Sequence, residues 1–326
     1  MARMTGPTTA APRPPAGAPR VASADVAVVI PCRNEEATIG DVVRRFREML
    51  PGAEILVVDN ASADATAGAA AQAGARVISE SRPGKGFALL TGFETARHAE
   101  YYVMVDGDGT YPVDDVERLL ETAAETGCDM VVATRLATPH TGAFRPGHAL
   151  GNRFFIRLVR LLFGIRTDDL FSGYRVLTRR FLRSAPLVAE GFDVEAELTV
   201  RAHQQGFRIV DVPVQYRPRS AVSSSKLRTF RDGYRILRGV LILFRDYRPL
   251  SFFGWLAVAL LVLSLLSGKA PVEDYLRTGL VHHLPRAVLA AALSTIAVLS
   301  LALGVLLSSI NRRAAELAAL LRKRSN

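Results

Sequence analysis

The sequence predicts an α/β protein in which a mostly parallel sheet with helices on both faces is followed by amphipathic helices and a two-helix transmembrane hairpin. Three observations predict this class. Short runs rich in Val and Ile alternate with helical stretches from about Asp25 to Pro218, which is typical of parallel sheets. Two stretches carry arginines at helical spacing among apolar residues. The last third of the 326 residues holds two long uncharged apolar segments.

The first 24 residues precede the predicted sheet and are rich in Ala, Pro, Thr and Arg. They contain no apolar run, so we expect a disordered leader and not a signal peptide. The α/β domain is expected to occupy residues 25–225. Its two cysteines, Cys32 and Cys128, indicate neither a disulfide framework nor a metal cluster, which agrees with a reducing compartment.

Five strands and four helices are expected in the first part of this domain. The helices should begin near Thr38, Asp64, Lys85 and Val113. Ligands of such sheets bind beyond the carboxyl ends of the strands. Polar clusters follow three of the strands: PCRNEE the first, DNASAD the second and DGDG the fourth. We therefore expect one crevice at this edge. The predicted strands are 26–30, 54–59, 75–79, 101–106 and 129–134.

The stretch YYVMVDGDGTYP at 101–112 is the most informative motif. An apolar strand there delivers Asp106 and Asp108 onto a turn that contains Gly107 and Gly109. A divalent cation such as Mg²⁺ takes one or two protein carboxylates and fills its other positions with water and phosphate oxygens. Glycines let a bulky diphosphate approach the backbone. The motif predicts a metal and phosphate site; an ordinary solvated turn is the alternative.

The other polar clusters have a chemical rationale too. Asp59 can accept a hydrogen bond from a ribose hydroxyl or a base amide, and Ser62 or Asp64 can cap the next helix. Glu35 can contact the base or sit in the first helical turn, where a carboxylate suits the helix dipole. Lys85 lies between two glycines and can hold phosphate, although the segment is not a Walker sequence and a plain glycine-rich turn fits equally well.

The two apolar segments are predicted to span a membrane at about 249–268 and 287–310. The second has 24 residues, enough to cross a hydrocarbon core of ~30 Å. A buried core helix is the alternative. Because the connection 269–286 is too short for a domain, the spans should form a hairpin within 249–310, followed by a basic tail at 311–326.

The net charge of +10 is concentrated at the C-terminal end. Residues 217–326 hold 17 Lys and Arg against 5 Asp and Glu, and the rest of the chain is close to neutral. A nucleic-acid partner would call for a basic soluble domain with a binding motif, so none is expected. Anionic lipid is the natural partner. Basic residues flank both spans on their outer sides, which predicts a cell-membrane protein with its large domain and tail in the cytoplasm.

Two amphipathic helices are expected at 151–164 and 226–248. Their arginines recur at spacings of three and four among apolar residues, which places them on one helical face. Both are typical of helices that lie in a membrane interface with their basic side toward phosphates. Packing against the soluble domain is the alternative. The arginines are Arg153, Arg157 and Arg160 in the first, and Arg228, Arg231, Arg235 and Arg238 in the second.

A family resemblance covers about residues 25–230. The motifs VVIPCRNEEATIG, ILVVDNASADATA, GKGFALLTG, VMVDGDGTYP, MVVATR, DLFSGYRV, FDVEAELTVRA and SSSKL occur in this order. The set resembles a family 2 glycosyltransferase of the dolichyl-phosphate or polyprenyl-phosphate glycosyltransferase group. This resemblance implies a GT-A (Rossmann-like) fold, a nucleotide-sugar donor, Mg²⁺ or Mn²⁺, inversion at the anomeric carbon, and a polyprenyl-phosphate acceptor.

The resemblance also implies roles for individual residues. Asp106 and Asp108 would face the metal diphosphate, and Arg135 would sit near the donor sugar and phosphates. Pro31, which also fixes the turn leaving the first strand, would contact the nucleoside together with Arg33, Glu35 and Asp59. Arg219 and Lys226 would close over the diphosphate. Ser172 and Arg175 would meet the acceptor phosphate, in addition to Arg153, Arg228 and Arg231, which their helical spacing and not the resemblance indicates.

The chain departs from the family pattern at three places. Asn60 stands where a second aspartate is frequent, and Thr110 stands where a glutamine metal ligand is frequent. The link from Arg219 to Lys226 is one residue longer than usual. These departures bear on donor identity, on metal geometry and on the role of Arg219.

The acceptor decides the chemistry. A lipid phosphate is already anionic and attacks directly, whereas a hydroxyl acceptor needs a general base. The nearest candidates for a base are Asp193, Glu195 and Glu197, with Glu195 expected first as the partner of an arginine. Three alternatives stay open: a hydroxyl acceptor on a small metabolite or glycolipid, a processive polysaccharide synthase, and a catalytically silent nucleotide-binding membrane adaptor. Nucleobase, sugar, lipid and homo-oligomeric state are left undetermined.

Overall fold

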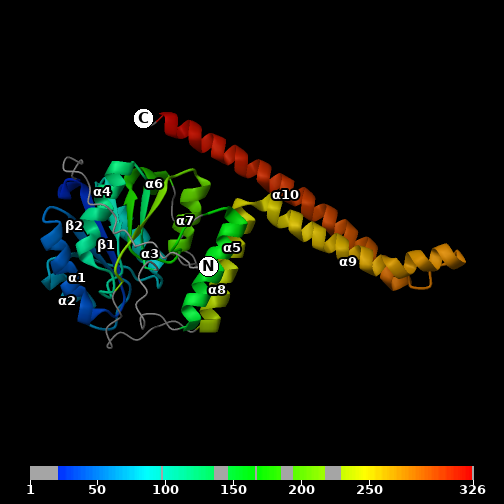
Figure 1. Cartoon of the computed structure of the whole chain (residues 1–326), viewed down its shortest axis with the longest axis horizontal. Helices are drawn as coiled ribbons and strands as arrows, with labels where there is room; N and C mark the ends of the chain where they lie inside the picture. Colours follow the sequence, from blue (N-terminus) through cyan, green and yellow to red (C-terminus); the bar gives the residue numbers. More distant parts are fainter. Residues whose placement is uncertain are drawn as a thin grey trace, which may run out of the picture. The chain divides into compact units, whose positions relative to one another are not determined.

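The computed structural model describes residues 21–96, 98–135, 146–165, 167–184, 194–216 and 229–324. The chain divides into two compact units. The first comprises Met1–Arg157 and Arg166–Thr229, and the second comprises Leu158–Ile165 and Phe230–Asn326 (Figure 1). Residues 1–20 of the predicted leader lie outside the described residues.

The first unit is built on a sheet whose strands, within the described residues, follow the order β3-β2-β1-β4-β6-β5-β7. All neighbours pair in parallel except β6, which is antiparallel to both β4 and β5. The five predicted strands are present, and β6 and β7 are additional. The bounds are β1 (Val26–Cys32), β2 (Glu54–Asp59), β3 (Arg76–Ser79), β4 (Tyr101–Met104), β5 (Met130–Thr134), β6 (Arg175–Thr178) and β7 (Ile209–Pro213).

Four helices of this unit begin within three residues of the predicted starts near Thr38, Asp64, Lys85 and Val113, whereas the helix predicted at 151–164 already begins at Pro146. The expected start near Val113 is a short 3₁₀ turn, Val113–Asp115, that leads into α4. Gly127, in the left-handed region with φ 59°, ends α4. The bounds are α1 (Glu36–Met49), α2 (Thr66–Gln72), α3 (Lys85–Thr95), α4 (Val116–Thr126), α5 (Pro146–Phe163), α6 (Arg179–Ser184) and α7 (Val194–Gln204).

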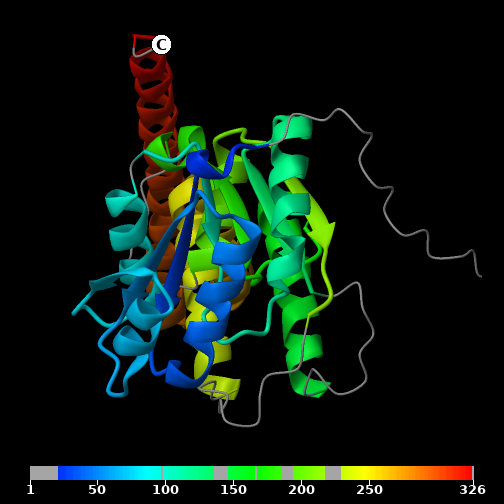
Figure 2. The ribbon, with the colours of Figure 1, turned by 90° about the vertical axis from the view of Figure 1, so that its left-hand side faces the viewer.

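Helices cover both faces of the sheet because alternate residues of each strand point to opposite sides. In β1, Val28 and Ile30 join the core formed with α1, α2 and α4. Ala27 and Val29 join the core formed with α3, α6 and α7. Figure 2 shows α1 and α4 in front of the sheet. Helix α3 packs very closely, since a Cβ at Gly92 would lie 2.3 Å from Cγ1 of Val29. This contact fixes the helix that begins with Lys85.

The second unit contains α8 (Thr229–Tyr247), α9 (Pro249–Thr278) and α10 (Leu284–Arg324). Helices α9 and α10 run side by side (Figure 1). The Ser264 hydroxyl donates to the carbonyl oxygen of Ala290 at 2.7 Å and lies 2.8 Å from Oγ of Ser294. Both helices are long and apolar enough to cross a membrane. In the most apolar 18-residue stretch of each helix, only 11% of α9 and 17% of α10 is buried. That exposure argues against a buried core helix.

The hairpin differs from its predicted bounds. Helix α9 continues to Thr278 and α10 begins at Leu284, so the predicted connection 269–286 shortens to residues 279–283. Lys269 and Glu273, one helical turn apart, support this extension. Gly279 ends α9 with a φ of 74°. The predicted tail is helical as far as Arg324, which its Ala, Leu, Arg and Lys content favours.

The predicted amphipathic helices are both present. In α8, Phe244 packs edge-to-face on Phe163 and on Phe252, and Nη2 of Arg248 donates to the Phe163 carbonyl oxygen at 2.9 Å. Tyr234 is 70% exposed on the same helix. Part of the apolar side of α8 is therefore packed within the second unit, on the end of α5 and the start of α9.

Candidate active site

The three predicted polar clusters meet at the carboxyl edge of the sheet. Cys32 at the end of β1 pairs with Asp59 at the end of β2, which brings the following loops together. The backbone N–H of Glu35 donates to Oγ1 of Thr66 at 2.8 Å, and that of Ala63 donates to Oδ1 of Asn34 at 2.7 Å. The Asp106–Asp108 turn follows β4 on the other side of β1. Parallel pairing thus builds the expected crevice.

Lys85 joins two carboxylates across this edge. Its Nζ lies on Oδ1 of Asp106 and on Oε1 of Glu195, which lies in the first turn of α7. Burial opposes the charge of the ammonium, but the two carboxylates raise the pKa of Lys85 above its usual value. Burial also opposes ionisation of Glu195, but Lys85 lowers the pKa of that carboxyl overall. The direct contact of Glu195 is therefore with Lys85, and the expected arginine, Arg175, acts on the carboxylate only through its charge.

Asp108 is held by its own turn. Its Oδ1 accepts the backbone N–H of Thr110 at 3.1 Å and the Thr110 hydroxyl at 2.6 Å. The turn is further fixed by Thr38, whose hydroxyl donates to the Gly107 carbonyl oxygen at 2.8 Å. Thr110, which stands where a glutamine is frequent in the family, therefore orients Asp108. An added Cβ at Gly107 would lie 2.4 Å from Sγ of the buried Cys32 and 2.5 Å from Oε2 of Glu35, so a larger residue would displace both side chains.

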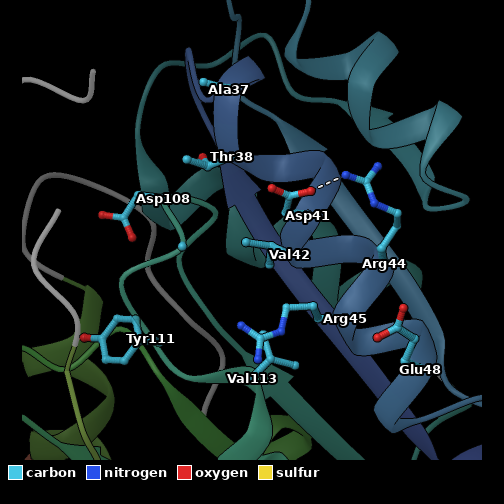
Figure 3. Close-up of a pocket in the computed structure, with 11 residues that line it drawn as sticks. Ala37, Thr38, Asp41, Val42, Arg44, Arg45, Glu48, Asp108, Tyr111 and Val113 are labelled. Atoms are coloured by element: carbon cyan, nitrogen blue, oxygen red, sulfur yellow. Dashed lines mark hydrogen bonds and ion pairs between the residues drawn. The ribbon is translucent and has the colours of Figure 1, made fainter. Parts of the chain in front are cut away.

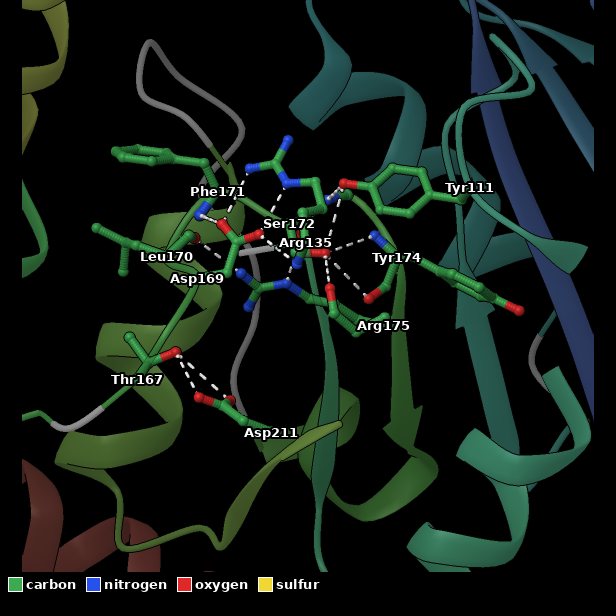
Figure 4. Close-up of polar contacts among 12 residues, drawn as sticks. Tyr111, Arg135, Thr167, Asp169, Leu170, Phe171, Ser172, Tyr174, Arg175 and Asp211 are labelled. Atoms are coloured by element: carbon green, nitrogen blue, oxygen red, sulfur yellow. Dashed lines mark hydrogen bonds and ion pairs between the residues drawn. The ribbon is translucent and has the colours of Figure 1, made fainter. Parts of the chain in front are cut away.

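Arg135 is clamped by a residue that the sequence argument missed. Its Nε and Nη2 donate to the two oxygens of Asp169 at 2.7 and 2.9 Å (Figure 4). The guanidinium also lies 5.6 Å from the ring centroid of Tyr216. Asp169 is fully buried, whereas the Arg135 side chain keeps 16% exposure. The sequence feature that could have pointed to Asp169 is the pair of aspartates, Asp168 and Asp169, directly before the LFSGYR motif. Buried and bidentate, Asp169 orients Arg135.

The segment after Asp169 forms the wall behind Asp106. An added Cβ at Gly173 would lie 2.3 Å from Oδ2 of Asp106, so the glycine makes room for this carboxylate. The Gly173 N–H donates to the Tyr111 hydroxyl oxygen at 2.8 Å. Burial raises the pKa of Tyr111, which keeps this hydroxyl neutral. Tyr111 thus links the DGDGTY turn to the segment that packs on it.

Ser172 and Arg175 were expected to meet the acceptor phosphate, and the structure places both in the interior with no exposed surface. The Ser172 hydroxyl donates to the Ala133 carbonyl oxygen at 2.5 Å. The Arg175 guanidinium donates to the carbonyl oxygens of Ser172 and Leu170 at 2.9 Å each, and to Oγ1 of Thr199 at 2.8 Å (Figure 4). In this structure their side chains are bonded within the protein and stabilise the 169–173 segment. A motif shows which residues occur but not which are buried.

Asn60 explains a departure from the family pattern. Its Nδ2 donates to the carbonyl oxygens of Glu80 and Arg82 at 3.1 and 2.7 Å, and its Oδ1 accepts the Gly84 N–H at 2.7 Å. The side chain is 4% exposed. An amide that both donates and accepts is needed here, and it fixes the loop that leads to Lys85.

The nucleoside candidates are placed as follows. Asp59 is 9% exposed, and within the described part of the chain its buried Oδ1 has no hydrogen-bond partner, a feature that suits a ligand. Pro31 is buried and paired with Val58 inside β1, so it does not form the expected turn. Arg33 is exposed, and Glu35 is the N-cap residue of α1.

Asp64 follows the capping expectation. Its Oδ1 accepts the N–H of Thr66, the first residue of α2, at 3.1 Å, and its Oδ2 accepts the N–H of Glu36 at 3.3 Å. The Asp64 carboxylate thereby ties the start of α2 to the start of α1.

A cavity of about 430 Å³ lies beside Asp108, between the polar face of α1 and the turn that follows the carboxylate (Figure 3). Two ion pairs border it: Arg45 binds Asp114 at 2.7 Å, and Arg44 pairs with Asp41. In Figure 3 the Asp108 carboxylate points away from these arginines.

The donor set suits a divalent metal that is completed by a ligand. Among the described residues, no group of three or more His, Cys, Asp or Glu side chains encloses a metal position. The carboxylates of Asp106 and Asp108 supply hard oxygens, and Mg²⁺ or Mn²⁺ with one or two protein carboxylates takes its remaining ligands from phosphates and water. The side chains of Asp106 and Asp108 therefore fit the Mg²⁺ or Mn²⁺ that the family resemblance implies.

Several predicted residues lie outside the described part of the chain. These are Asp193, Arg219, Lys226 and Arg228, and the side chains of Arg153 and Arg231 are also outside it.

Comparison with known proteins gives the class. The family description "Glycosyl transferase family 2" matches residues 27–184. Glycosyltransferase AglJ of Haloferax volcanii is 35% identical over 229 residues, which are 70% of this chain and 75% of the relative. Polyprenol monophosphomannose synthase of Mycolicibacterium smegmatis is 32% identical over 227 residues, 62% of this chain and 82% of the relative.

A solved structure shows the same fold. The glucosyl-3-phosphoglycerate synthase of Mycobacterium tuberculosis, in complex with Mn²⁺, UDP and glucosyl-3-phosphoglycerate, aligns with a TM-score of 0.57 at 24% identity, covering 72% of this chain and 85% of that one. The fold and its carboxyl-edge site define a glycosyltransferase with the predicted GT-A architecture. The chain belongs to glycosyl transferase family 2, as the sequence motifs predicted.

Proposed function

We propose that this enzyme transfers a hexose or related sugar from a nucleotide-sugar to a polyprenyl phosphate at the cytoplasmic face of the cell membrane, with inversion and with Mg²⁺ or Mn²⁺. The observation that carries this proposal is the carboxyl edge of the sheet, where Lys85 pairs with Asp106 and Asp169 orients Arg135. The same chain has two helices able to span a membrane. A relative named polyprenol monophosphomannose synthase supports the acceptor.

On the donor side, Asp59 would accept a hydrogen bond from the nucleoside, because its buried oxygen needs a donor. Arg33 and Glu35 lie in the neighbouring loop, and Pro31 supports it from within β1. Asp106 and Asp108 would hold the metal. The cation would supply charge neutralisation to the departing diphosphate.

On the acceptor side, an oxygen of the lipid phosphate would form the new bond to the anomeric carbon while the bond from this carbon to the donor diphosphate breaks. Attack from the face opposite the leaving group inverts the configuration. An anionic acceptor has no proton to remove, so positioning and charge stabilisation suffice. Arg135, oriented by Asp169, would stabilise charge near the sugar and phosphates.

The described carboxylates of α7 favour this acceptor over a hydroxyl. Glu195 is engaged by Lys85, and its lowered pKa makes it a weak base. Glu197 is engaged by Arg201, at 2.7 Å from Oε1 to Nε. A hydroxyl acceptor would need a general base, and of the three candidates only Asp193 lies outside the described residues. Arg153, Arg228 and Arg231 are proposed to meet the lipid phosphate, and Arg219 and Lys226 to close over the diphosphate.

The test is transfer of label to lipid. Membranes that contain the protein are incubated with a panel of radiolabelled nucleotide-sugars and the lipid phase is extracted. We expect metal-dependent label in the lipid for one donor, lost in Asp108→Asn. Asp114→Asn is the matched control, because Asp114 lies nearby but forms an exposed pair with Arg45. Near-normal transfer by Asp108→Asn would remove the metal assignment, and label only in water-soluble products would support a small hydroxyl acceptor.

A further inference from the structure

We infer that Lys85 occupies the cation position on Asp106 until a donor diphosphate draws it away, so that a divalent metal binds tightly with the nucleotide and weakly without it. This inference rests on the proposed function, because it takes Asp106 as a metal ligand. It makes Lys85 a positioning residue that sets the order of binding.

The geometry puts Lys85 in competition with the metal. One side of the Asp106 carboxylate packs on Gly173, where an added Cβ would lie 2.3 Å from Oδ2. The other oxygen, Oδ1, contacts Nζ of Lys85. The carboxylate is 28% exposed, so an ion can approach it from solvent. A metal that takes Oδ1 must therefore displace the ammonium or sit beside it.

Electrostatics makes the second option unfavourable. A divalent ion and an ammonium a few ångströms apart repel strongly where the site is partly buried. Glu195, with a side chain only 9% exposed, holds the other side of the same ammonium. Within the described residues, the Lys85 ammonium is thus shared between Asp106 and Glu195.

A diphosphate can release this arrangement. Lysine carries a compact charge on a flexible stem. Lys85 is the first residue of α3 and follows Gly84, which has a φ of 140° and provides no side-chain cap. The donor brings negative charge for Lys85 to follow and phosphate oxygens for the metal. Metal and nucleotide affinities are therefore coupled, and the coupling is reciprocal.

The experiment measures Mn²⁺ binding to the full chain in detergent, from the electron paramagnetic resonance signal of free Mn²⁺, with and without UDP. We expect Lys85→Met to bind Mn²⁺ alone about tenfold more tightly, since one positive charge beside the site is gone. Glu195→Gln should weaken binding of Mn²⁺ alone, because Lys85 then serves Asp106 only. UDP should raise Mn²⁺ affinity less in Lys85→Met than in the parent protein.

The matched control is Arg76→Met. Arg76 forms an ion pair with Glu54 at the amino ends of β3 and β2, so this change also removes one positive charge beside a carboxylate, but at the opposite edge of the sheet. Mn²⁺ binding should not change. If Lys85→Met fails to fold, the double variant Lys85→Met/Glu195→Gln decides, since it leaves no unpaired carboxylate at position 195; it should also bind Mn²⁺ more tightly than the parent.

Unchanged or weaker Mn²⁺ binding by a folded Lys85 variant overturns the inference. If Asp108→Asn abolishes Mn²⁺ binding in that case, the proposed metal site stands and only the role of Lys85 is wrong. If Asp108→Asn leaves Mn²⁺ binding intact, the metal assignment and the inference both fall.

Discussion

Asp169 holds the guanidinium of Arg135 with both carboxylate oxygens, at 2.7 and 2.9 Å, and is itself fully buried. It also accepts the Phe171 N–H at 3.2 Å through Oδ1. One carboxylate therefore sets both the direction of Arg135 and the start of the segment that packs on Asp106. Two parts of the site are thus coupled through the Asp169 side chain.

Asp169→Asn should keep the shape of the side chain but lose the charge-assisted hydrogen bonds to Arg135. Because a hydrogen bond to a charged group contributes about 1.5–3 kcal/mol, we expect sugar transfer to fall by roughly 10- to 100-fold, mainly in kcat. Steady-state kinetics with varied donor measures it. Asp168→Asn is the control, since Asp168 is exposed and its backbone N–H, not its side chain, binds Asp211 at 2.8 Å. Equal kinetics for the two variants would contradict the clamp.

Asn60→Asp should destabilise the loop before Lys85. Aspartate cannot donate to the carbonyl oxygens of Glu80 and Arg82, which would lose their bonds at a cost of about 1–3 kcal/mol. Thermal unfolding and protease cleavage in the loop measure this. Asn34→Asp is the control, because its Oδ1 only accepts, from the Ala63 N–H, and a carboxylate can do the same. The prediction is wrong if Asn60→Asp melts like the parent.

Loss of a basic residue at the acceptor side should act on the lipid. Each lost contact should weaken binding of the polyprenyl phosphate by about 1–3 kcal/mol. Changing Arg153, Arg157, Arg228 or Arg231 to Gln is therefore expected to raise KM for this lipid and to leave KM for the nucleotide-sugar nearly unchanged. Kinetics with each substrate varied in turn distinguish the two effects.

Amide variants of the α7 carboxylates test the competing chemistry. A general base contributes ~10²- to 10⁴-fold in rate, so a phosphate acceptor predicts a smaller loss for Glu197→Gln. Glu195→Gln also removes the ion pair with Lys85, so its rate of transfer is compared with its Mn²⁺ affinity. A loss of that size in folded Glu197→Gln, with unchanged lipid KM in the arginine variants, would make a hydroxyl the better acceptor.

Charge around the hairpin predicts its orientation. A tag after Asn326 should be protected in sealed right-side-out cells, and one next to Thr278, at the end of α9, should be accessible. Protease protection of the two tags measures this. Both tags on one face would mean that α9 and α10 do not span as a hairpin.

The sequence by itself determined the local elements and the edge on which the site lies. Strands such as Glu54–Asp59 and the long helices α9 and α10 follow from hydrophobic runs and their length. The placement of Asp59 and Asp106 at one edge follows from a general property of parallel strands, whose carboxyl ends share one edge. The periodicity of hydrophobic residues and the direction of successive strands can both be inferred from the sequence alone.

Only the tertiary structure decided which side chains meet. Strand β6 inserts between β4 and β5, against the order of the chain, and so brings Gly173 to Asp106. Lys85 finds Glu195 across 110 positions of sequence, and Asp169 finds Arg135 across 34. Arg175 looks like a ligand-binding cation in the motif but is closed into the core. Burial and long-range pairing depend on how the elements pack in three dimensions, which local sequence patterns do not encode.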